Sequence, residues 1–182
     1  PVLNMPLDYV RPLTQQFEGE AVEFHVHGDT YQGVRRLIRE KNVTLYMVLT
    51  AALNILLHRY SGQEDIIIGS PVSGRTHQDL ETVNGLMVDA VAIRSFPEAG
   101  KPLETFLEEV KKQSLGAFEN QDYPFKEILE KAVYRHDPSR NPIFDVMLIL
   151  QNIDMEPLKF EGLKVVPCDC DQKVSKVDIS LE

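Results

Sequence analysis

The chain has 182 residues, of which 43% are hydrophobic, and carries a formal net charge of −9 at pH 7. This length supports one sizeable hydrophobic core, so we expect a single α/β domain. The acidic balance, without a Lys/Arg-rich run, would repel a phosphate backbone and argues against a nucleic-acid partner. The most apolar stretch, residues 45–57, is shorter than a membrane span, so we expect no membrane partner.

The first twenty residues contain prolines and a glycine without an apolar period, and are predicted to be an extended lead-in or linker to a domain over residues 21–182. In "AVEFHVH" (21–27), apolar and polar residues alternate, which predicts a half-buried strand. His25 and His27 would lie on its polar face. They lack a third ligand nearby in sequence, so a polar strand face is favoured over a metal site.

Two helices are predicted next. Asp29 or Thr30 is placed to cap the first, which runs to about Lys41 with one apolar stripe. Thr44 is placed to cap the second, which runs to about Tyr60 and is apolar nearly all round, as in a buried central helix. A short run of isoleucines, 66–68, is typical of an interior strand.

The glycines of "GSPVSGRT" (69–76) follow that strand and resemble a phosphate-binding loop with Arg75 in place of lysine. Only residues 80–83 keep helical spacing afterwards, so the helix that a phosphate loop needs is missing. A nucleophile elbow at Ser73 fails because Pro71 replaces its first glycine. The favoured interpretation is a sharp turn at the strand end, with Arg75 anchoring the loop to an acid.

Further elements follow in order. Residues 86–95 are strand-like, Pro102 begins an amphipathic helix to about Glu119, and Pro124 begins another whose apolar stripe reaches Val133. Asp122 or Tyr123 is placed at the cap of that last helix. Residues 143–151 form a strongly apolar strand, followed by short strands to the end. Helices in pairs between strands predict a mixed β-sheet with helices packed against it.

Cys168 and Cys170 are the two cysteines, and they offer no disulfide framework. A metal site would need more ligands than this segment supplies, so we predict no metal. Because no signal peptide is apparent, free cysteines fit a reducing compartment, and the expected location is cytoplasmic.

Four stretches in order strongly resemble the condensation domains of nonribosomal peptide synthetases: "GSPVSGRTHQDLE", "NGLMVDAVAIR", "NQDYPFKEI" and "RHDPSRNPIFDVMLILQN". "PLDYVRP" (6–12) resembles the segment that joins the two lobes of such a domain. The resemblance implies a chloramphenicol acetyltransferase-like lobe, a two-layer α/β sandwich. Two such lobes form the cleft in which an acceptor amine attacks a donor thioester.

The family's catalytic motif, His-His-x-x-x-Asp-Gly, lies on the first lobe, and none of this chain's five histidines is adjacent to another. The chain therefore resembles the second, C-terminal lobe, without the family's last segment, and we expect no catalytic residue in it. The implied partners are the first lobe, donor and acceptor peptidyl carrier proteins and an adjacent adenylation domain. No cofactor is expected to bind directly, because phosphopantetheine arms arrive on the carriers.

The resemblance assigns two sets of site residues. The family usually has asparagine where this chain has Asp89, which introduces a carboxylate into a cleft-lining strand and puts substrate choice in doubt. Asp122 and Arg140 are expected to pair structurally. The substrate-cleft set is Gly69, Ser70, Gly74, Arg75, Gly85, Met87 and Asp89, and the structural set is Asn120, Gln121, Asp122, Pro124, Phe125, Ser139, Arg140, Asn141 and Pro142.

Two other functions stay open. One is a noncatalytic docking module that recruits carrier proteins or partner enzymes, which loss of the histidine motif upstream would favour. An epimerase-type relative fits less well, because "NQDYPF" and "SRNPIF" look like those of condensing members.

Overall fold

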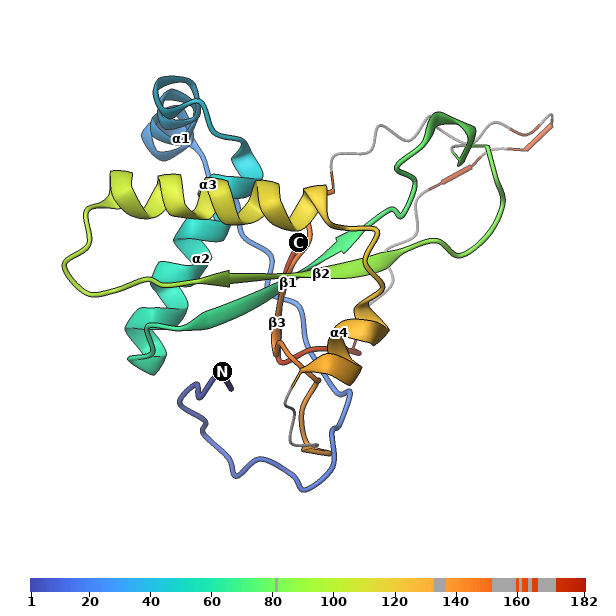
Figure 1. The fold of residues 1–182 in the computed structure, drawn as a ribbon, viewed down its shortest axis with the longest axis horizontal. Coiled ribbons are helices and arrows are strands. Elements are labelled where there is room, and N and C mark those ends of the chain that lie inside the picture. The colour runs from blue at the N-terminus through green and yellow to red at the C-terminus, as the bar shows by residue number, and fades with distance from the viewer. Residues whose placement is uncertain (81, 133–136, 152–159, 161, 164, 167–172) are drawn as a thin grey trace.

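A computed structural model describes residues 1–80, 82–132, 137–151, 160, 162–163, 165–166 and 173–182 (Figure 1). Its helices and strands are α1 (Gly28–Lys41), α2 (Leu45–Ser61), β1 (Ile66–Val72), the 3-10 helix η1 (Gln78–Leu80), β2 (Asp89–Ser95), α3 (Leu103–Glu119), α4 (Phe125–Lys131), β3 (Val146–Leu148) and β4 (Ile179–Leu181).

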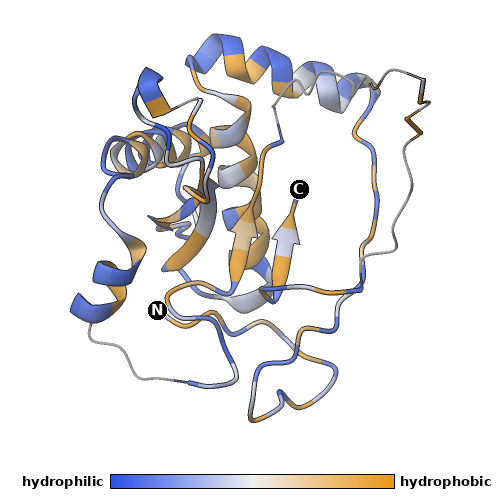
Figure 2. Ribbon diagram, turned by 90° about the vertical axis from the view of Figure 1, so that its right-hand side faces the viewer, coloured by the Kyte–Doolittle hydropathy of each residue, from blue (hydrophilic) through white to orange (hydrophobic). Residues whose placement is uncertain are grey.

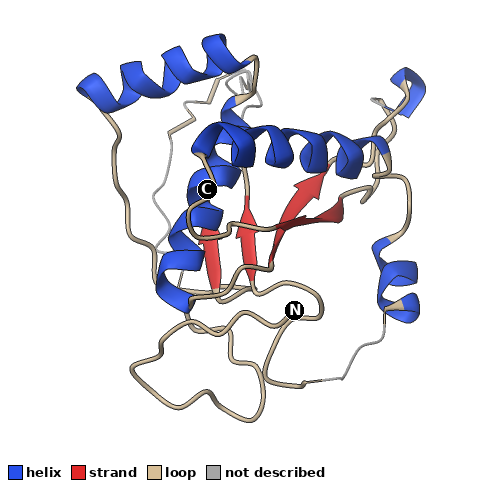
Figure 3. Cartoon of the chain, turned by 60° about the vertical axis from the view of Figure 1, so that its left-hand side comes forward, coloured by secondary structure: helices blue, strands red, loops and turns tan. Residues whose placement is uncertain are grey.

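The strands form one mixed sheet in the order β2-β1-β3-β4. β1 pairs antiparallel with β2 along its whole length, from Ile66 opposite Ser95 to Val72 opposite Asp89. β3 pairs parallel with both β1 and β4. Helix α2 packs on β1 and α3 on β2, and the two helices contact each other, so they form one helical layer against the sheet (Figure 3). The predicted mixed α/β sandwich is confirmed.

The core lies between that helical layer and the sheet. Side chains of α2 such as Leu57 pack against alternate residues of β1, Ile66 and Ile68, and against Ile93 of β2. A second cluster joins the other side of α2 to Phe106 and Val110 of α3. Figure 2 shows the apolar residues gathered along the strands and the inner helix faces. Helix α2 is therefore the buried central helix that its composition predicts.

The boundaries of α1, α2 and α3 agree closely with the prediction, and Thr44 caps α2 by accepting a hydrogen bond from the Met47 N–H at 3.2 Å. The cap predicted for α1 is wrong: the helix begins at Gly28, its N-cap is His27, and no side chain caps it. The cap predicted for α4 is also wrong: the helix begins at Phe125, its N-cap is Pro124 and not Asp122 or Tyr123, and no side chain caps it.

Three strand predictions need correction. Residues 21–27 belong to no strand, and Val22 and Phe24 are exposed, not half-buried. β1 does not end at Ile68 but continues through Gly69 and Ser70 to Val72. The apolar stretch 143–151 contains only the short β3, and its first residue, Ile143, has a positive φ of 68° and so is not part of an extended chain. The predicted helical position Val133 lies outside the described residues.

The lead-in, residues 1–20, packs on the rest of the chain. Leu3 and Met5 contact the core beside α2 and β1. Arg11 forms an ion pair with Asp178, and Gly19 N–H donates to the Lys173 carbonyl at 3.0 Å. Figure 1 shows this segment passing from the amino terminus beneath the sheet toward α1.

Candidate functional site

Gly69 lies inside β1, where it pairs with Ala92 of β2 and Met147 of β3. A Cβ on Gly69 would stand 2.3 Å from the Phe144 ring. The glycine thus lets an aromatic ring lie directly on the strand backbone, and does not form a turn. Its neighbour Ser70 is buried on the opposite face, because side chains alternate along a strand.

The turn falls later, at Gly74. Its φ is +63°, and a Cβ there would stand 1.9 Å from the Met87 carbonyl oxygen, so only glycine fits. This close approach joins the two ends of the excursion from β1 to β2, which we call the 73–88 loop.

Arg75 holds the same loop from inside. Its guanidinium donates hydrogen bonds to the carbonyls of Ser73, Val83 and Gly85, at 3.3–3.4 Å. The predicted anchor to an acid is therefore wrong among the described residues: the partners are backbone carbonyls. Arg75 therefore links three backbone positions of the 73–88 loop.

The turn before α4 contacts both the 73–88 loop and β2. Thr76 donates a hydrogen bond from Oγ1 to Asp122 Oδ1 at 3.1 Å. Asp89 accepts from the Phe125 N–H at 3.5 Å and from the Ala90 N–H at 2.8 Å. The half-buried carboxylate of Asp89 thus joins the start of β2 to the start of α4.

Phe125 also contacts the fourth of the stretches that carry the resemblance. Its ring packs against Phe144, with centroids 5.5 Å apart, and Phe144 lies on Gly69. Contacts join residues 69, 89, 125 and 144, and the pair Thr76–Asp122 adjoins them through the short turn 122–125, although up to 75 positions separate these residues in sequence. We call this set of residues the four-stretch cluster.

Arg140 pairs with a different residue from the one predicted. It forms an ion pair with Asp145 at 2.8 Å and donates to the Leu3 carbonyl, also at 2.8 Å. The predicted pairing with Asp122 is wrong, since Asp122 accepts from Thr76. Burial raises the pKa of Asp145, although the hydrogen bond from Arg140 opposes that shift.

The remaining residues of the structural set bond mainly to backbone. Asn120 and Gln121 donate to carbonyls in the last turn of α3, at 2.8 and 2.9 Å. Ser139 bonds to Asp137, Asn141 donates to the Lys176 carbonyl at 2.6 Å, and the Pro142 carbonyl accepts from the Phe144 N–H. These contacts shape turns.

Several alternative sites lack support in the described part of the chain. Among the described residues, only the short η1 lies between Gly74 and β2, where a phosphate loop would have a substantial helix. No three His, Cys, Asp or Glu side chains among the described residues are grouped to hold a metal, and Cys168 and Cys170 lie outside those residues. Within the same residues, no single helix has the length and apolar composition to cross a membrane; only α1 and α2, bent by 113°, meet that criterion as a pair.

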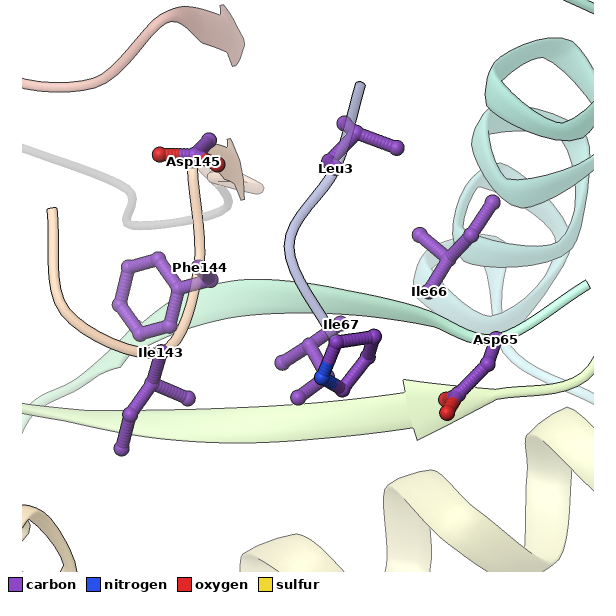
Figure 4. Close-up of a pocket in the computed structure, with 8 residues that line it drawn as sticks. Leu3, Asp65, Ile66, Ile67, Ile143, Phe144 and Asp145 are labelled. Carbon is purple, nitrogen blue, oxygen red and sulfur yellow. The ribbon is translucent and has the colours of Figure 1, made fainter. Parts of the chain in front are cut away.

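Two cavities of the described residues lie mostly away from the four-stretch cluster, and of its members only Phe144 lines one of them. Figure 4 looks into a recess of about 10 Å³ between β1, Leu3 and the Ile143–Asp145 turn, which has room for about one water molecule. An open hollow of about 760 Å³ lies along the outer side of α3. The Gly69–Phe144 and Phe125–Phe144 contacts make the cluster a packed wall.

Sequence reasoning missed two members of that wall, Thr76 and Phe144. Both lie in stretches that carry the resemblance, Thr76 next to Arg75 and Phe144 two positions after Pro142. A signal for Phe144 was available in the sequence. A glycine inside a strand often marks a place where another part of the chain packs closely on the strand backbone.

Comparison with known proteins gives consistent results. A family model described as "Condensation domain" matches residues 1–182. The chain is 47% identical over 182 residues to one of the plipastatin synthase proteins of Bacillus subtilis and 46% identical to tyrocidine synthase 3 of Brevibacillus parabrevis. All of the chain is covered, but only 5% and 3% of those two proteins.

Solved structures agree on the fold. A four-domain nonribosomal peptide synthetase bound to AMP and glycine matches with a TM-score of 0.81 at 27% identity, over 84% of this chain and 12% of that one. The X-domain from teicoplanin biosynthesis, solved with OxyB, matches with a TM-score of 0.78 at 20% identity, over 98% and 39%. With the family model matched over its whole length, this chain belongs to the condensation domain family of nonribosomal peptide synthetases.

Proposed function

We propose that this chain is the C-terminal lobe of a condensation domain that forms peptide bonds within a larger synthetase. The observation that carries the proposal is the four-stretch cluster: the stretches that resemble condensing members meet through Gly69, Phe144, Phe125 and Asp89. Fold alone would not imply this activity, because one fold hosts many functions.

In the proposed reaction, the amine nitrogen of the acceptor attacks the thioester carbonyl carbon of the donor. A C–N bond forms, the C–S bond breaks, and the donor phosphopantetheine leaves as a thiol while the nitrogen loses a proton. The histidine motif for this chemistry belongs to the first lobe, and this lobe supplies cleft wall and contacts to the donor and acceptor carriers. The adenylation domain would load the acceptor.

The cleft wall is assigned to β1, the 73–88 loop and the start of β2. Gly74 keeps the loop closed against the Met87 carbonyl, and Arg75 bonds it to Gly85. In this proposal, the closed loop is a wall along which a narrow thioester arm lies. We place the boundary between the lead-in and the lobe near residue 20.

The proposal is tested by a condensation assay with loaded donor and acceptor carrier proteins. The complete domain, this chain together with the first lobe and the last segment from its parent gene, should form dipeptide, and this chain alone should not exceed the uncatalysed rate. Dipeptide from the chain alone would contradict the lobe assignment. A complete domain that binds carriers without forming dipeptide would instead favour the docking module.

Asp89 supplies a matched variant in the same assay. Asp89→Asn keeps a side-chain oxygen to accept from Phe125 and removes the charge, so the melting temperature of the domain should stay unchanged. We expect a changed acceptor preference or pH–rate profile, because a carboxylate beside the cleft would position or deprotonate the incoming ammonium. Identical rate, preference and pH profile would show that Asp89 only joins β2 to α4.

A further inference from the structure

The lead-in is bound to the rest of the chain at three separate places. The first is a clamp around Gln63, whose side-chain amide donates to the Val2 carbonyl at 2.8 Å and accepts from the Asn4 N–H at 2.6 Å. Between these two residues, the Leu3 carbonyl accepts from Arg140 at 2.8 Å. Three consecutive residues of the lead-in are therefore bonded to side chains of the lobe.

The second place is at residues 11–15. The Arg11 guanidinium donates two hydrogen bonds to the Asp178 carboxylate, a fork geometry that fixes orientation as well as distance. Gln15 is held through both backbone and side chain, since its N–H donates to the Pro138 carbonyl at 2.8 Å and its amide to the Lys176 carbonyl at 3.2 Å. The middle of the lead-in thus bonds to two segments of the lobe.

The third place is an antiparallel bridge between Glu18 and Val174. The Gly19 N–H donates to the Lys173 carbonyl at 3.0 Å on one side of it, and on the other side the Ser175 N–H donates to the carbonyl of residue 17 at 2.9 Å. A Cβ on Gly19 would stand 2.9 Å from the Ser175 Cβ, so the two segments lie in direct contact. The lead-in is therefore bound to the lobe near its beginning, middle and end.

The clamp around Gln63 holds the chain at the start of β1. Leu3 lines a recess there together with Ile66, Ile67 and Asp145, as Figure 4 shows. β1 runs from this point to the 73–88 loop, and at roughly 3.3 Å per residue its two ends lie about 20 Å apart. The place where the lead-in is clamped and the proposed cleft wall of the 73–88 loop are thus at opposite ends of one strand.

We propose that residues 2–19 form a fixed strap on this lobe, and that the two lobes of the complete domain move relative to each other by bending of the chain on the first-lobe side of Val2. This inference rests on the proposed function, which supplies the first lobe. Bending within the strap would require bonds at several places to break, whereas a hinge needs only a few unrestrained residues. Rotation about the start of β1 would move the first lobe most beside the 73–88 loop, and so widen or narrow the cleft.

Amide hydrogen exchange in this chain alone tests the strap. The amides of Asn4 and Gln15 should exchange at least roughly 10-fold more slowly than in unfolded peptide, because both are hydrogen-bonded. Gln63→Ala should remove the protection at Asn4 and leave it at Gln15. The matched control, Gln32→Ala at an exposed position of α1, should change neither. Unprotected amides in the unsubstituted chain, or loss at both positions in Gln63→Ala, would overturn three separate attachments.

Distances between spin labels in the complete domain locate the hinge. Labels replacing Val10 and Tyr60, which are 96% and 62% exposed, report on the strap against the lobe. Their distance distribution should be narrow, and should be the same in this chain alone. A label on the first lobe, paired with residue 60, should give a broader distribution. Equal widths for the two pairs, whether narrow or broad, would overturn the hinge before Val2.

A disulfide tests whether the strap must leave the lobe during the reaction. Opposed residues of an antiparallel pair have Cα atoms about 4.5–5.5 Å apart, within the span of a disulfide. Glu18→Cys with Val174→Cys, in a Cys168→Ser and Cys170→Ser background, should oxidise readily. The oxidised and reduced complete domains should form dipeptide at the same rate. A rate that falls on oxidation and returns on reduction, or failure to oxidise, would overturn the fixed strap.

The condensation assay reports on the proposed function separately from the strap. Dipeptide formation by a domain whose 10–60 distance is broad would refute only the strap. A narrow 10–60 distance and a broad distance to the first lobe, without dipeptide, would refute only the enzyme.

Discussion

At the scale of single residues, the contact between Gly69 and Phe144 gives a sharp stability prediction. In Gly69→Ala the new Cβ would meet a ring that is itself buried, 2.3 Å away, so the ring or the strand must shift. We expect the free energy of unfolding in urea to fall by about 1–3 kcal/mol, the usual effect of overpacking.

The matched control is Gly116→Ala in α3, where a Cβ meets nothing within 4 Å. Alanine should stabilise the helix by about 0.5–1 kcal/mol. A second substitution, Phe144→Leu, should recover part of the loss in Gly69→Ala, because the two sites share one space. Equal stability of Gly69→Ala and the unsubstituted chain would mean that Phe144 does not rest on β1.

At the scale of elements, helix α2 depends on its first turn. The Thr44 hydroxyl accepts from Met47 N–H, which would otherwise be one of the unpaired donors of a helix start. Thr44→Ala should lower the free energy of unfolding by about 1 kcal/mol, and Thr44→Ser, which keeps the hydroxyl, by much less. Urea titrations of both variants measure the difference, and indistinguishable midpoints would rule out the cap.

At the scale of the whole molecule, a network around Asp145 joins three distant segments. Arg140 links Asp145 to the Leu3 carbonyl, and the Asp145 carbonyl accepts from the Asp178 N–H at 2.9 Å. Asp178 in turn pairs with Arg11. The lead-in, the turn before β3 and the approach to β4 are therefore held by one set of partly buried charges.

This network predicts a pH dependence. Burial raises the pKa of Asp145 above its ordinary 3.8, so between these two values the folded state binds more protons than the unfolded state. The stability that protonated Asp145 contributes is complete below 3.8 and is lost as pH rises through the raised pKa. The free energy of unfolding of the unsubstituted chain, minus that of Asp145→Asn, should therefore fall as pH rises.

Urea titrations from about pH 3.5 to about pH 7 measure that difference. Other carboxylates, such as Asp65, whose pKa the Arg94 hydrogen bond lowers, are present in both proteins and largely cancel. A difference that stays constant or grows with pH would mean that the ion pair with Arg140 outweighs burial.

The sequence by itself determined the local elements. The apolar periods predicted α1, α2 and α3 with nearly their observed bounds, and Thr44 was identified as a cap, because helix periodicity and capping involve residues within a few positions of each other. The family resemblance likewise rests on short stretches, and the family comparison confirmed it.

Only the tertiary structure decided which residues meet. It placed Gly69 inside a strand under Phe144, and it paired Arg75 with backbone carbonyls and Asp122 with Thr76. It also left the alternating segment 21–27 outside every strand formed by the described residues. The physical reason is the separation in sequence between interacting residues: a strand, an ion pair or a packed glycine depends on a partner far along the chain. Alternation in residues 21–27 specifies a strand's two sides, but only a neighbouring sheet edge can supply its hydrogen bonds.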